Sequence, residues 1–273
     1  MKQYEAGIYD ISNDDYHSST GISRSQLMRL KKSPLHFWNE YLNPDYIKQE
    51  PTEAMIFGSA VHTYLLEKDK FGEQYTVMEK IDRRTKDGKE AYANLLAMSA
   101  GKQLISSETF EQLVSIEKSL SKDTEALALL SNGLVEQSIY WNDPDTGVLC
   151  KVRPDIIHSN MVIDLKTTSD GSYRAFQLSA FKYGYDIQMA MIHEAFKHGL
   201  NKEMKDFVFV AIEKESPHAI ACYPVDESFI DEAILDFKAL LRKYKECLNK
   251  NEWPSYEKRM LTRPGFAKYE VIE

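Results

Sequence analysis

Two carboxylates and a lysine near the middle of the chain have the residue types and the spacing for metal-dependent chemistry. Asp155 is followed, eight residues later, by Asp164, and Lys166 comes two positions after that. If residues 161–166 form a strand, Asp164 and Lys166 project from one face, because alternate side chains of a strand share a face. A hairpin with the preceding strand would then bring the carboxylate of Asp155 beside that of Asp164.

Such a group suits hydrolysis assisted by a divalent cation. Carboxylate oxygens on adjacent strands hold Mg²⁺ or Mn²⁺, and the bound cation lowers the pKa of a water and neutralises charge that develops on a phosphate. Lys166 could orient the attacking water or stabilise the same negative charge. The alternative is a solvated polar face, because Asp-x-Lys occurs by chance in many strands. Asp155 at hairpin distance, within Arg-Pro-Asp, favours the metal site.

The elements that must position these residues form an α/β (α+β layered) pattern. Residues 1–130 read as a mostly helical portion that begins with an extended arm to about residue 20, and residues 131–273 read as a core rich in strands, all within a single domain. Ser23 opens one helix through a capping box with Gln26, and Pro34 begins another. The other predicted helices are 53–67, 90–100, 107–120, 172–199 and 229–248, and the predicted strands are 75–78, 136–141, 148–157, 161–168, 206–213 and 219–225.

Composition limits the class of protein. The chain has 273 residues, with 43% hydrophobic and 28% charged residues, which is typical of a globular protein and excludes collagen, coiled coil and disorder. Its apolar stretches are too short to span a bilayer, and residues 1–17 lack a signal-peptide core, so we expect a cytoplasmic protein without a membrane partner. Three scattered cysteines indicate neither a disulfide framework nor a zinc site.

The net charge is negative, since 34 Lys+Arg against 42 Asp+Glu gives 34 − 42 = −8. An acidic balance at first argues against nucleic acid as a partner. A chain that binds DNA needs basic side chains along one channel only, and we therefore expect them to gather near the face that carries Lys166.

The spacing Asp155–x8–Asp164–x–Lys166 resembles the PD-(D/E)XK nuclease signature, in the variant with an upstream Arg-Pro-Asp that RecB-type exonucleases carry. Across nearly the whole chain the sequence resembles the exonuclease VIII (RecE) family of phage and prophage recombination nucleases. The segments that carry this resemblance are 7–17, 21–27, 57–62 with 66–67, 83–85, 138–150, 247–249 and 252–254. The resemblance implies a PD-(D/E)XK core with a central mixed sheet flanked by helices.

The resemblance also implies roles for individual residues. Asp155 and Asp164 match the metal-binding carboxylates, His62 matches a histidine that joins them, and the backbone carbonyl of Leu165 is a further candidate ligand. Lys166 matches the catalytic lysine. By its residue type alone, His62 would be interpreted as a hydrogen-bonded histidine of the core or the surface. Glu136, on the first predicted core strand, could be an outer-shell acid of the metal site, and a structural role is the simpler interpretation.

Gln188 matches the glutamine of the family's Gln-x-x-x-Tyr motif, which positions the scissile phosphate or the lysine. The chain departs from this motif because Ile192 stands where the tyrosine belongs. Tyr183 or Tyr185, one turn earlier, could substitute for it. Without the resemblance, a glutamine on an amphipathic helix is usually a solvated residue.

Two segments are candidates for DNA contact. Arg24 and Ser25 belong to a Ser-x-Ser-x-Leu…Pro-x-x-Phe element that this nuclease group shares, and gripping a 5′ end is a role it could have. Arg83 and Arg84 lie in a predicted loop, where basic side chains can reach phosphates. The alternative for that loop is a solvated charge run, because acidic residues accompany the basic ones.

The function that these observations predict is a Mg²⁺-dependent exodeoxyribonuclease. The resemblance implies that it degrades the 5′-ended strand of linear double-stranded DNA and leaves 3′ tails for a RecT-like annealing protein. It also implies a homo-oligomeric ring, a tetramer or a trimer. One alternative is a structure-specific nuclease of the same fold, although three scattered cysteines disfavour a Cas4-like iron–sulfur form. Another is a non-catalytic DNA-end-binding protein on a nuclease-derived fold; the chemically intact set of candidate residues favours an enzyme.

Overall fold

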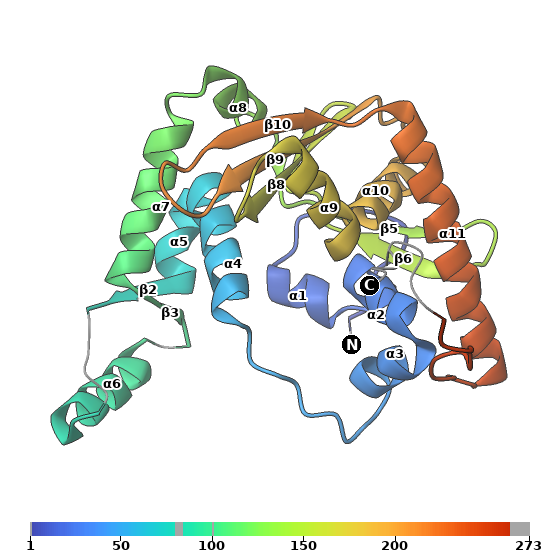
Figure 1. Ribbon diagram of the computed structural model, residues 1–273, viewed down its shortest axis with the longest axis horizontal. Helices are drawn as coiled ribbons and strands as arrows, with labels where there is room; N and C mark the ends of the chain where they lie inside the picture. The colour runs from blue at the N-terminus through green and yellow to red at the C-terminus, as the bar shows by residue number, and fades with distance from the viewer. Residues whose placement is uncertain (1, 80–83, 100, 263–273) are drawn as a thin grey trace, which may run out of the picture.

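The computed structural model describes residues 2–79, 84–99 and 101–262, and its centre is a five-stranded mixed sheet (Figure 1). The strand order is β10-β9-β8-β7-β4, in which β8 and β9 run parallel and every other neighbouring pair is antiparallel. This confirms the predicted α/β fold class with a central mixed sheet. The strands are β4 (Leu134–Val135), β7 (Ile156–His158), β8 (Met161–Thr168), β9 (Asp206–Glu213) and β10 (Ile220–Pro224).

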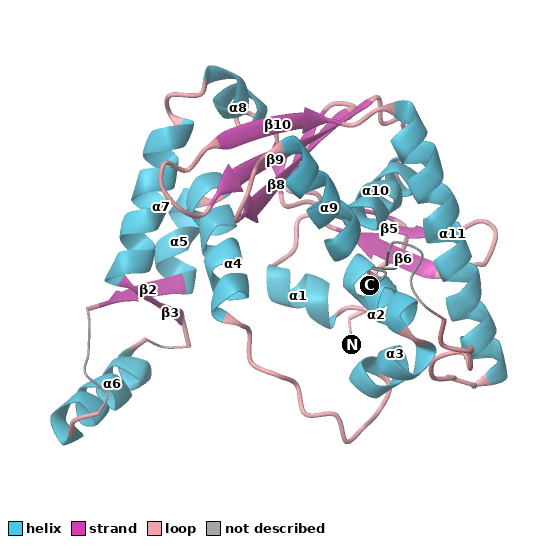
Figure 2. Cartoon of the chain, viewed as in Figure 1, coloured by secondary structure: helices cyan, strands magenta, loops and turns pink. Residues whose placement is uncertain are grey.

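Helices cover both faces of this sheet (Figure 2). α10 (Tyr185–Gly199) and α11 (Glu227–Lys250) share one hydrophobic core with Val162 of β8. α4 (Glu53–Leu66) and α7 (Ser107–Leu120) share the other with Ile163 and Leu165 of the same strand. The predicted alternation along β8 is therefore correct, but the face that carries Asp164 and Lys166 is buried too. Strand β8 lies in the middle of the sheet, where neither face meets solvent freely.

A second, three-stranded antiparallel sheet has the order β1-β5-β6, with β1 (Gly7–Tyr9), β5 (Ser138–Asn142) and β6 (Leu149–Val152). The N-terminal segment is therefore not an extended arm, because β1 pairs with β5 and is followed by α1 (Asn13–Ser18). The hydroxyl of Ser12 caps α1 by accepting the backbone N–H of Asp15 at 3.1 Å. Both elements are too short for hydrophobic periodicity to reveal them.

Two predicted elements are each broken in two. The strand predicted over 148–157 ends as β6 in one sheet and resumes as β7 in the other, and Pro154, which has no N–H to donate to a ladder, lies in the crossing segment. The helix predicted over 172–199 consists of α9 (Tyr173–Tyr183) and α10, separated by Gly184 in the left-handed conformation with φ of 69°. In both places the hydrophobic pattern continues across the break.

The predicted helix starts at Ser23 and Pro34 are confirmed. The backbone N–H of Ser23 donates to Oε1 of Gln26 at 2.8 Å, and Pro34 is the first residue of its helix. No helix among the residues that the structure describes is long and apolar enough to span a membrane. The remaining elements are α2 (Arg24–Lys32), α3 (Pro34–Tyr41), α5 (Lys68–Gln74), β2 (Tyr75–Met78), α6 (Lys86–Met98), β3 (Gln103–Ser106) and α8 (Thr124–Leu129).

The two hydrophobic cores draw on both the helical N-terminal portion and the strand-rich remainder. Leu27 and Phe37 pack with Phe196 of α10, while Ala60 and Ile116 belong to the core under β8. The change of sequence texture near residue 130 therefore marks a change in local structure, and each core is built across it. α6 lies apart from both cores, beyond the parallel pair β2 and β3 (Figure 1).

Candidate active site

The pairing of β7 with β8 brings the two predicted carboxylates together. Ile156 pairs with Ile163, so Asp155, directly before β7, lies beside Asp164 and Leu165 on β8. Oδ2 of Asp155 accepts the backbone N–H of Leu165 at 2.6 Å. The hairpin that the sequence predicts is therefore present, although its first strand is only β7.

Asp164 is fully buried, which excludes the solvated-face interpretation of Asp-x-Lys. Its carboxylate forms an ion pair with Lys166, and its Oδ1 accepts a hydrogen bond from Nε2 of Gln188 at 2.7 Å. Burial raises the pKa of Asp164 to about 6, although the Lys166 ammonium acts against this shift. Gln188 thus contacts the catalytic candidates directly and is not a solvated helix residue.

The first turn of α10 holds both members of this ion pair. Gln188 reaches Asp164, while the ring of Tyr185, three residues earlier on the same helix, has its centre 4.8 Å from Nζ of Lys166. Ile192, at the motif position for tyrosine, is buried in the core. Of the two tyrosines that could substitute for it, Tyr185 is the one that contacts Lys166.

His62 reaches the same place from α4, on the other side of the site. Its Nδ1 lies 3.5 Å from Oδ2 of Asp155, and its side chain is 24% exposed. Burial lowers the pKa of His62, but the adjacent Asp155 carboxylate outweighs burial and raises it to about 9. The reciprocal effect lowers the pKa of Asp155 against the effect of its own burial.

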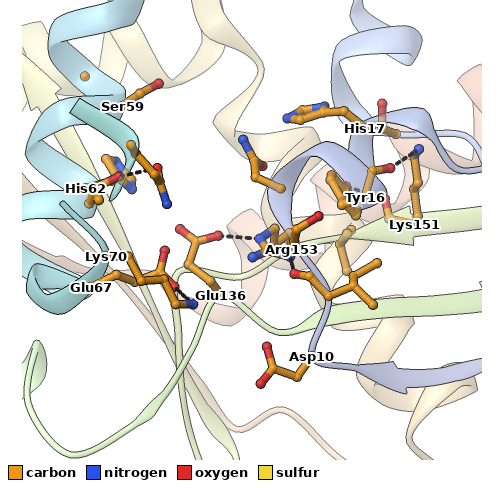
Figure 3. A pocket seen from close by; sticks show the side chains of 18 of the residues that line it. Asp10, Tyr16, His17, Ser59, His62, Glu67, Lys70, Glu136, Lys151 and Arg153 are labelled. Carbon is orange, nitrogen blue, oxygen red and sulfur yellow. Dashed lines mark hydrogen bonds and ion pairs between the residues drawn. The ribbon is translucent and has the colours of Figure 1, made fainter. Parts of the chain in front are cut away.

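Glu136 completes a cluster of metal-ligand type. One ligand atom each from His62, Glu136 and Asp155 lie within 4.8 Å of one another. Burial raises the pKa of Glu136 to about 7, and the Asp155 carboxylate adds to the shift. Figure 3 shows Glu136 between His62 and Arg153, whose Nε donates to Oε2 of Glu136 at 2.6 Å.

The sequence analysis favoured a structural role for Glu136, whereas the structure places its carboxylate beside His62 and Asp155. Glu136 lies between β4 and β5, in different sheets, and has a φ of 51°, which few residues other than glycine adopt. Its backbone N–H donates to the carbonyl oxygen of Asp155 at 2.9 Å. No periodic pattern marks such a residue, because it reaches the site through an irregular backbone between two strands. An observed strained residue of this kind is itself an indication of function.

The described residues include a cavity of about 740 Å³ in front of this cluster. Its walls come from α1, α2, α4, α5 and the segment that joins the two sheets (Figure 3). The charged residues that line it are of both signs: Arg24, Lys70, Lys151 and Arg153 against Asp10, Glu67, Glu73 and Glu136. Basic side chains are therefore present beside the site, as expected, but they are interleaved with acidic ones.

The predicted DNA contacts are placed unequally. Arg24 and Ser25 line the cavity, and Nη1 of Arg24 donates to the backbone carbonyl of Tyr183 at 2.7 Å. Arg84 lies just before α6 and does not line the cavity, and Arg83 falls outside the described residues. The metal-ligand roles of Asp164 and of the Leu165 carbonyl stay predictions, since the mutually close ligand atoms belong to His62, Glu136 and Asp155.

Comparison with known proteins decides the family. Residues 23–262 match the family described as "PDDEXK-like domain of unknown function (DUF3799)". The chain belongs to this PDDEXK-like family. The PD-(D/E)XK core that the spacing indicates is thus confirmed, while the narrower resemblance to the exonuclease VIII (RecE) family stays a prediction.

Solved structures agree on the fold. A putative exonuclease from Eubacterium rectale is 18% identical, with 94% of this chain and 96% of that chain covered and a TM-score of 0.59. A phage-related exonuclease from Haemophilus somnus 129PT is 13% identical over 62% of this chain and 85% of that chain, and its TM-score of 0.33 is too low to support an argument. No curated protein matches this PDDEXK-like chain.

Proposed function

We propose that this PDDEXK-like protein is a Mg²⁺-dependent exodeoxyribonuclease that degrades the 5′-ended strand of linear double-stranded DNA. The observation that carries the proposal is the convergence of Asp155, Asp164 and Lys166 with His62 and Gln188. His62 and Gln188 line the cavity, and the other three lie behind them. A buried ion pair beside a carboxylate–histidine pair is expensive to build, and groups with perturbed pKa values beside a cavity are typical of functional sites.

The donor set fits a divalent cation. The cation would be held by His62, Glu136 and Asp155, whose ligand atoms are closely spaced. The two carboxylates suit Mg²⁺, and the imidazole nitrogen of His62 makes Mn²⁺ suitable as well. His62 would have to give up the proton that Asp155 stabilises on it before its nitrogen could act as a ligand. When bound, the cation would supply an activated water and neutralise charge on the phosphate.

The chain's own residues would orient and polarise the substrate. Lys166, fixed between Asp164 and the ring of Tyr185, presents a positive charge where the phosphate would develop negative charge. Gln188 holds the Asp164 carboxylate and thereby the direction of that ammonium. Arg153 holds Glu136 in place through its Nε, which donates to the carboxylate. Arg153 is itself anchored by its Nη1, which donates to the backbone carbonyl oxygen of Ile11 at 2.9 Å.

DNA would enter by the cavity of about 740 Å³. Contacts with phosphate and sugar would dominate, because such contacts hold a nucleic acid without reading its sequence, and the cavity lining includes Arg24, Lys70, Lys151 and Arg153. Arg24 and Ser25 are the proposed contacts on the α2 side. The 3′ tails would then be substrates for a RecT-like annealing protein. A homo-oligomeric ring, a tetramer or a trimer, would keep the enzyme on its substrate, and mass measurement in solution would reveal it.

Digestion of end-labelled DNA tests the proposal. Linear duplex with a label at the 5′ or the 3′ terminus of one strand is incubated with the purified protein, in Mg²⁺ or in EDTA. The proposal predicts early release of the 5′ label, late release of the 3′ label and no release in EDTA. Release from the 3′ end first, release in EDTA, or nicking of closed circular duplex at the same rate would each contradict it.

A further inference from the structure

A second cavity, of about 490 Å³, lies at the end of β8 beyond Lys166. Its walls are the first turn of α4, the residues that follow Lys166, and one side of α9 with the start of α10. The residues that the argument uses are Ala54, Thr167, Thr168, Tyr183, Tyr185 and Lys214. None of these has a part in the cluster of metal-ligand type.

The two cavities flank the Asp164–Lys166 pair. Gln188, which holds Asp164, lines the larger cavity, while Tyr185, which lies against Lys166, lines the smaller one. Thr167, the residue after Lys166, also lines the smaller cavity. It lies close to Gly58 in the wall of the larger cavity, since a Cβ added to Gly58 would be 3.6 Å from Oγ1 of Thr167. A strand cut at Lys166 would thus have one cavity on each side of the cut.

The smaller cavity has an aromatic wall. The rings of Tyr183 and Tyr185 stack with centroids 5.9 Å apart and an interplanar angle of 30°, and Tyr183 is 49% exposed. The backbone of Tyr183 is fixed by the hydrogen bond from Arg24. An exposed tyrosine on a fixed backbone is a stacking surface for a base, because every base has a π-face and stacking tolerates any sequence.

The rest of the lining suits a sugar and a phosphate. Thr167 contributes a hydroxyl group and Lys214 a cation, while the hydroxyl of Thr168 is engaged with the backbone of Asp170. The exposed ammonium of Lys182 lies 5.1 Å from the centre of the Tyr183 ring and adds positive charge at the mouth. The acidic residue in the lining, Asp170, already accepts the backbone N–H of Ser172 at 2.8 Å.

We propose that the smaller cavity binds a single nucleotide next to the cleaved bond, with its base stacked on Tyr183. The proposal rests on the proposed nuclease function for its biological meaning and adds the chemical class of the ligand. The cavity is sized for one nucleotide and not for a duplex, so it would receive a terminal nucleotide separated from its complementary strand. Stacking without base-edge readout would make this site indifferent to sequence.

Calorimetric titration with thymidine 5′-monophosphate in EDTA tests this inference. The wild-type chain and Tyr183→Phe, which keeps the ring, are expected to bind the nucleotide equally. Tyr183→Ala is expected to weaken binding by about tenfold or more, because stacking of one base is lost. Deoxyribose 5-phosphate, which has no base, is expected to bind wild type and Tyr183→Ala alike.

Two further variants locate the effect. Tyr173→Ala removes a 68% exposed tyrosine from the far end of α9 and should leave binding unchanged. Ala54→Phe adds a ring to an exposed position of the opposite wall and should abolish binding. Unchanged affinity in Tyr183→Ala or in Ala54→Phe, an equal loss in Tyr173→Ala, or no binding by wild type would overturn the inference.

The failure of this inference and that of the proposed function are separable, because EDTA prevents metal-dependent hydrolysis during the titration. Nucleotide binding that depends on Tyr183 in a chain without nuclease activity would contradict the proposed function alone. Nuclease activity in a chain that binds no nucleotide at Tyr183 would contradict this inference alone.

Discussion

At the scale of residues, the site concentrates buried charge that must be balanced within a few ångströms. The Asp155 carboxylate is balanced by His62, that of Glu136 by Arg153 and that of Asp164 by Lys166. Each pairing lowers the cost of burying a carboxylate. A bound divalent cation would instead balance the carboxylates of Asp155 and Glu136, with His62 as a neutral ligand.

Glu136→Gln tests that account at a single side chain. The substitution keeps size and hydrogen-bonding capacity but removes one negative charge from the cluster, so Mn²⁺ affinity measured by calorimetry should fall by roughly tenfold or more. Glu73→Gln removes the same charge from an exposed residue of the same cavity and should change the affinity little. Equal losses in the two variants would mean that only the general charge of the cavity matters.

At the scale of elements, the break between α9 and α10 sets the direction of the helix that contacts the Asp164–Lys166 pair. Gly184 is in the left-handed conformation, and a Cβ there would lie 2.4 Å from Sδ of Met28 on α2. The close approach of α2 and the direction of α10 therefore both require a glycine. Tyr185 and Gln188 take their positions from this break.

Gly184→Ala should consequently lower the free energy of unfolding more than the same substitution does at a left-handed glycine with free space around it. Gly147→Ala is the matched control, since its φ is 67° and no atom lies within 4 Å of the added Cβ. Urea unfolding should show a loss of about 1–2 kcal/mol for Gly147→Ala, from backbone strain alone, and a larger loss for Gly184→Ala. Similar losses would show that Met28 moves aside without cost and that the packing at this break is loose.

The elements also show what a sequence can and cannot predict. Asp155, Asp164 and Lys166 were predictable because a short hairpin fixes them, and Gln188 because the family motif marks it. Glu136 was not predictable, since a left-handed residue between two sheets carries it. The break at Gly184 was missed for a related reason: hydrophobic periodicity reports which face is buried, and that face continues from α9 into α10.

At the scale of the whole molecule, a buried ion network ties the layers together away from the site. Lys238 of α11 pairs with Asp143, in the turn between β5 and β6, and with Glu194 of α10 at 2.7 Å. Burial raises the pKa of Glu194, but His193 and Lys238 outweigh it and lower the value to about 2. The pKa of Asp143 is also lowered, because Lys238 and Thr146 outweigh its burial.

This network predicts the acid sensitivity of the fold. A carboxylate with a lowered pKa in the folded state stabilises the protein above its ordinary pKa and loses that contribution as pH falls through the folded value. For Glu194 the window runs from about pH 4.5 down to about 2, and the loss is on the order of 3 kcal/mol. His193 and His198 also face Glu194, at 3.6 Å and 3.5 Å.

The free energy of unfolding, measured in urea across this window, should therefore fall more steeply for wild type than for Lys238→Met. The variant removes the cation, so its carboxylates already lack the pairing that acid would disrupt, and its stability is lower throughout. Parallel curves for the two proteins would mean that the network does not set the acid limit.

We propose that Lys166, with the carboxylates beside it, takes part directly in the hydrolysis of DNA. The most direct measurement of this role is the rate at which nucleotides are released from linear duplex in Mg²⁺. Wild type is compared with Lys166→Ala and with Lys70→Ala, a lysine on the wall of the same cavity. Urea unfolding of each variant confirms that it is folded. This role of Lys166 predicts near-normal release by Lys70→Ala and a loss of at least about a hundredfold in folded Lys166→Ala. Release by folded Lys166→Ala at the wild-type rate would contradict it.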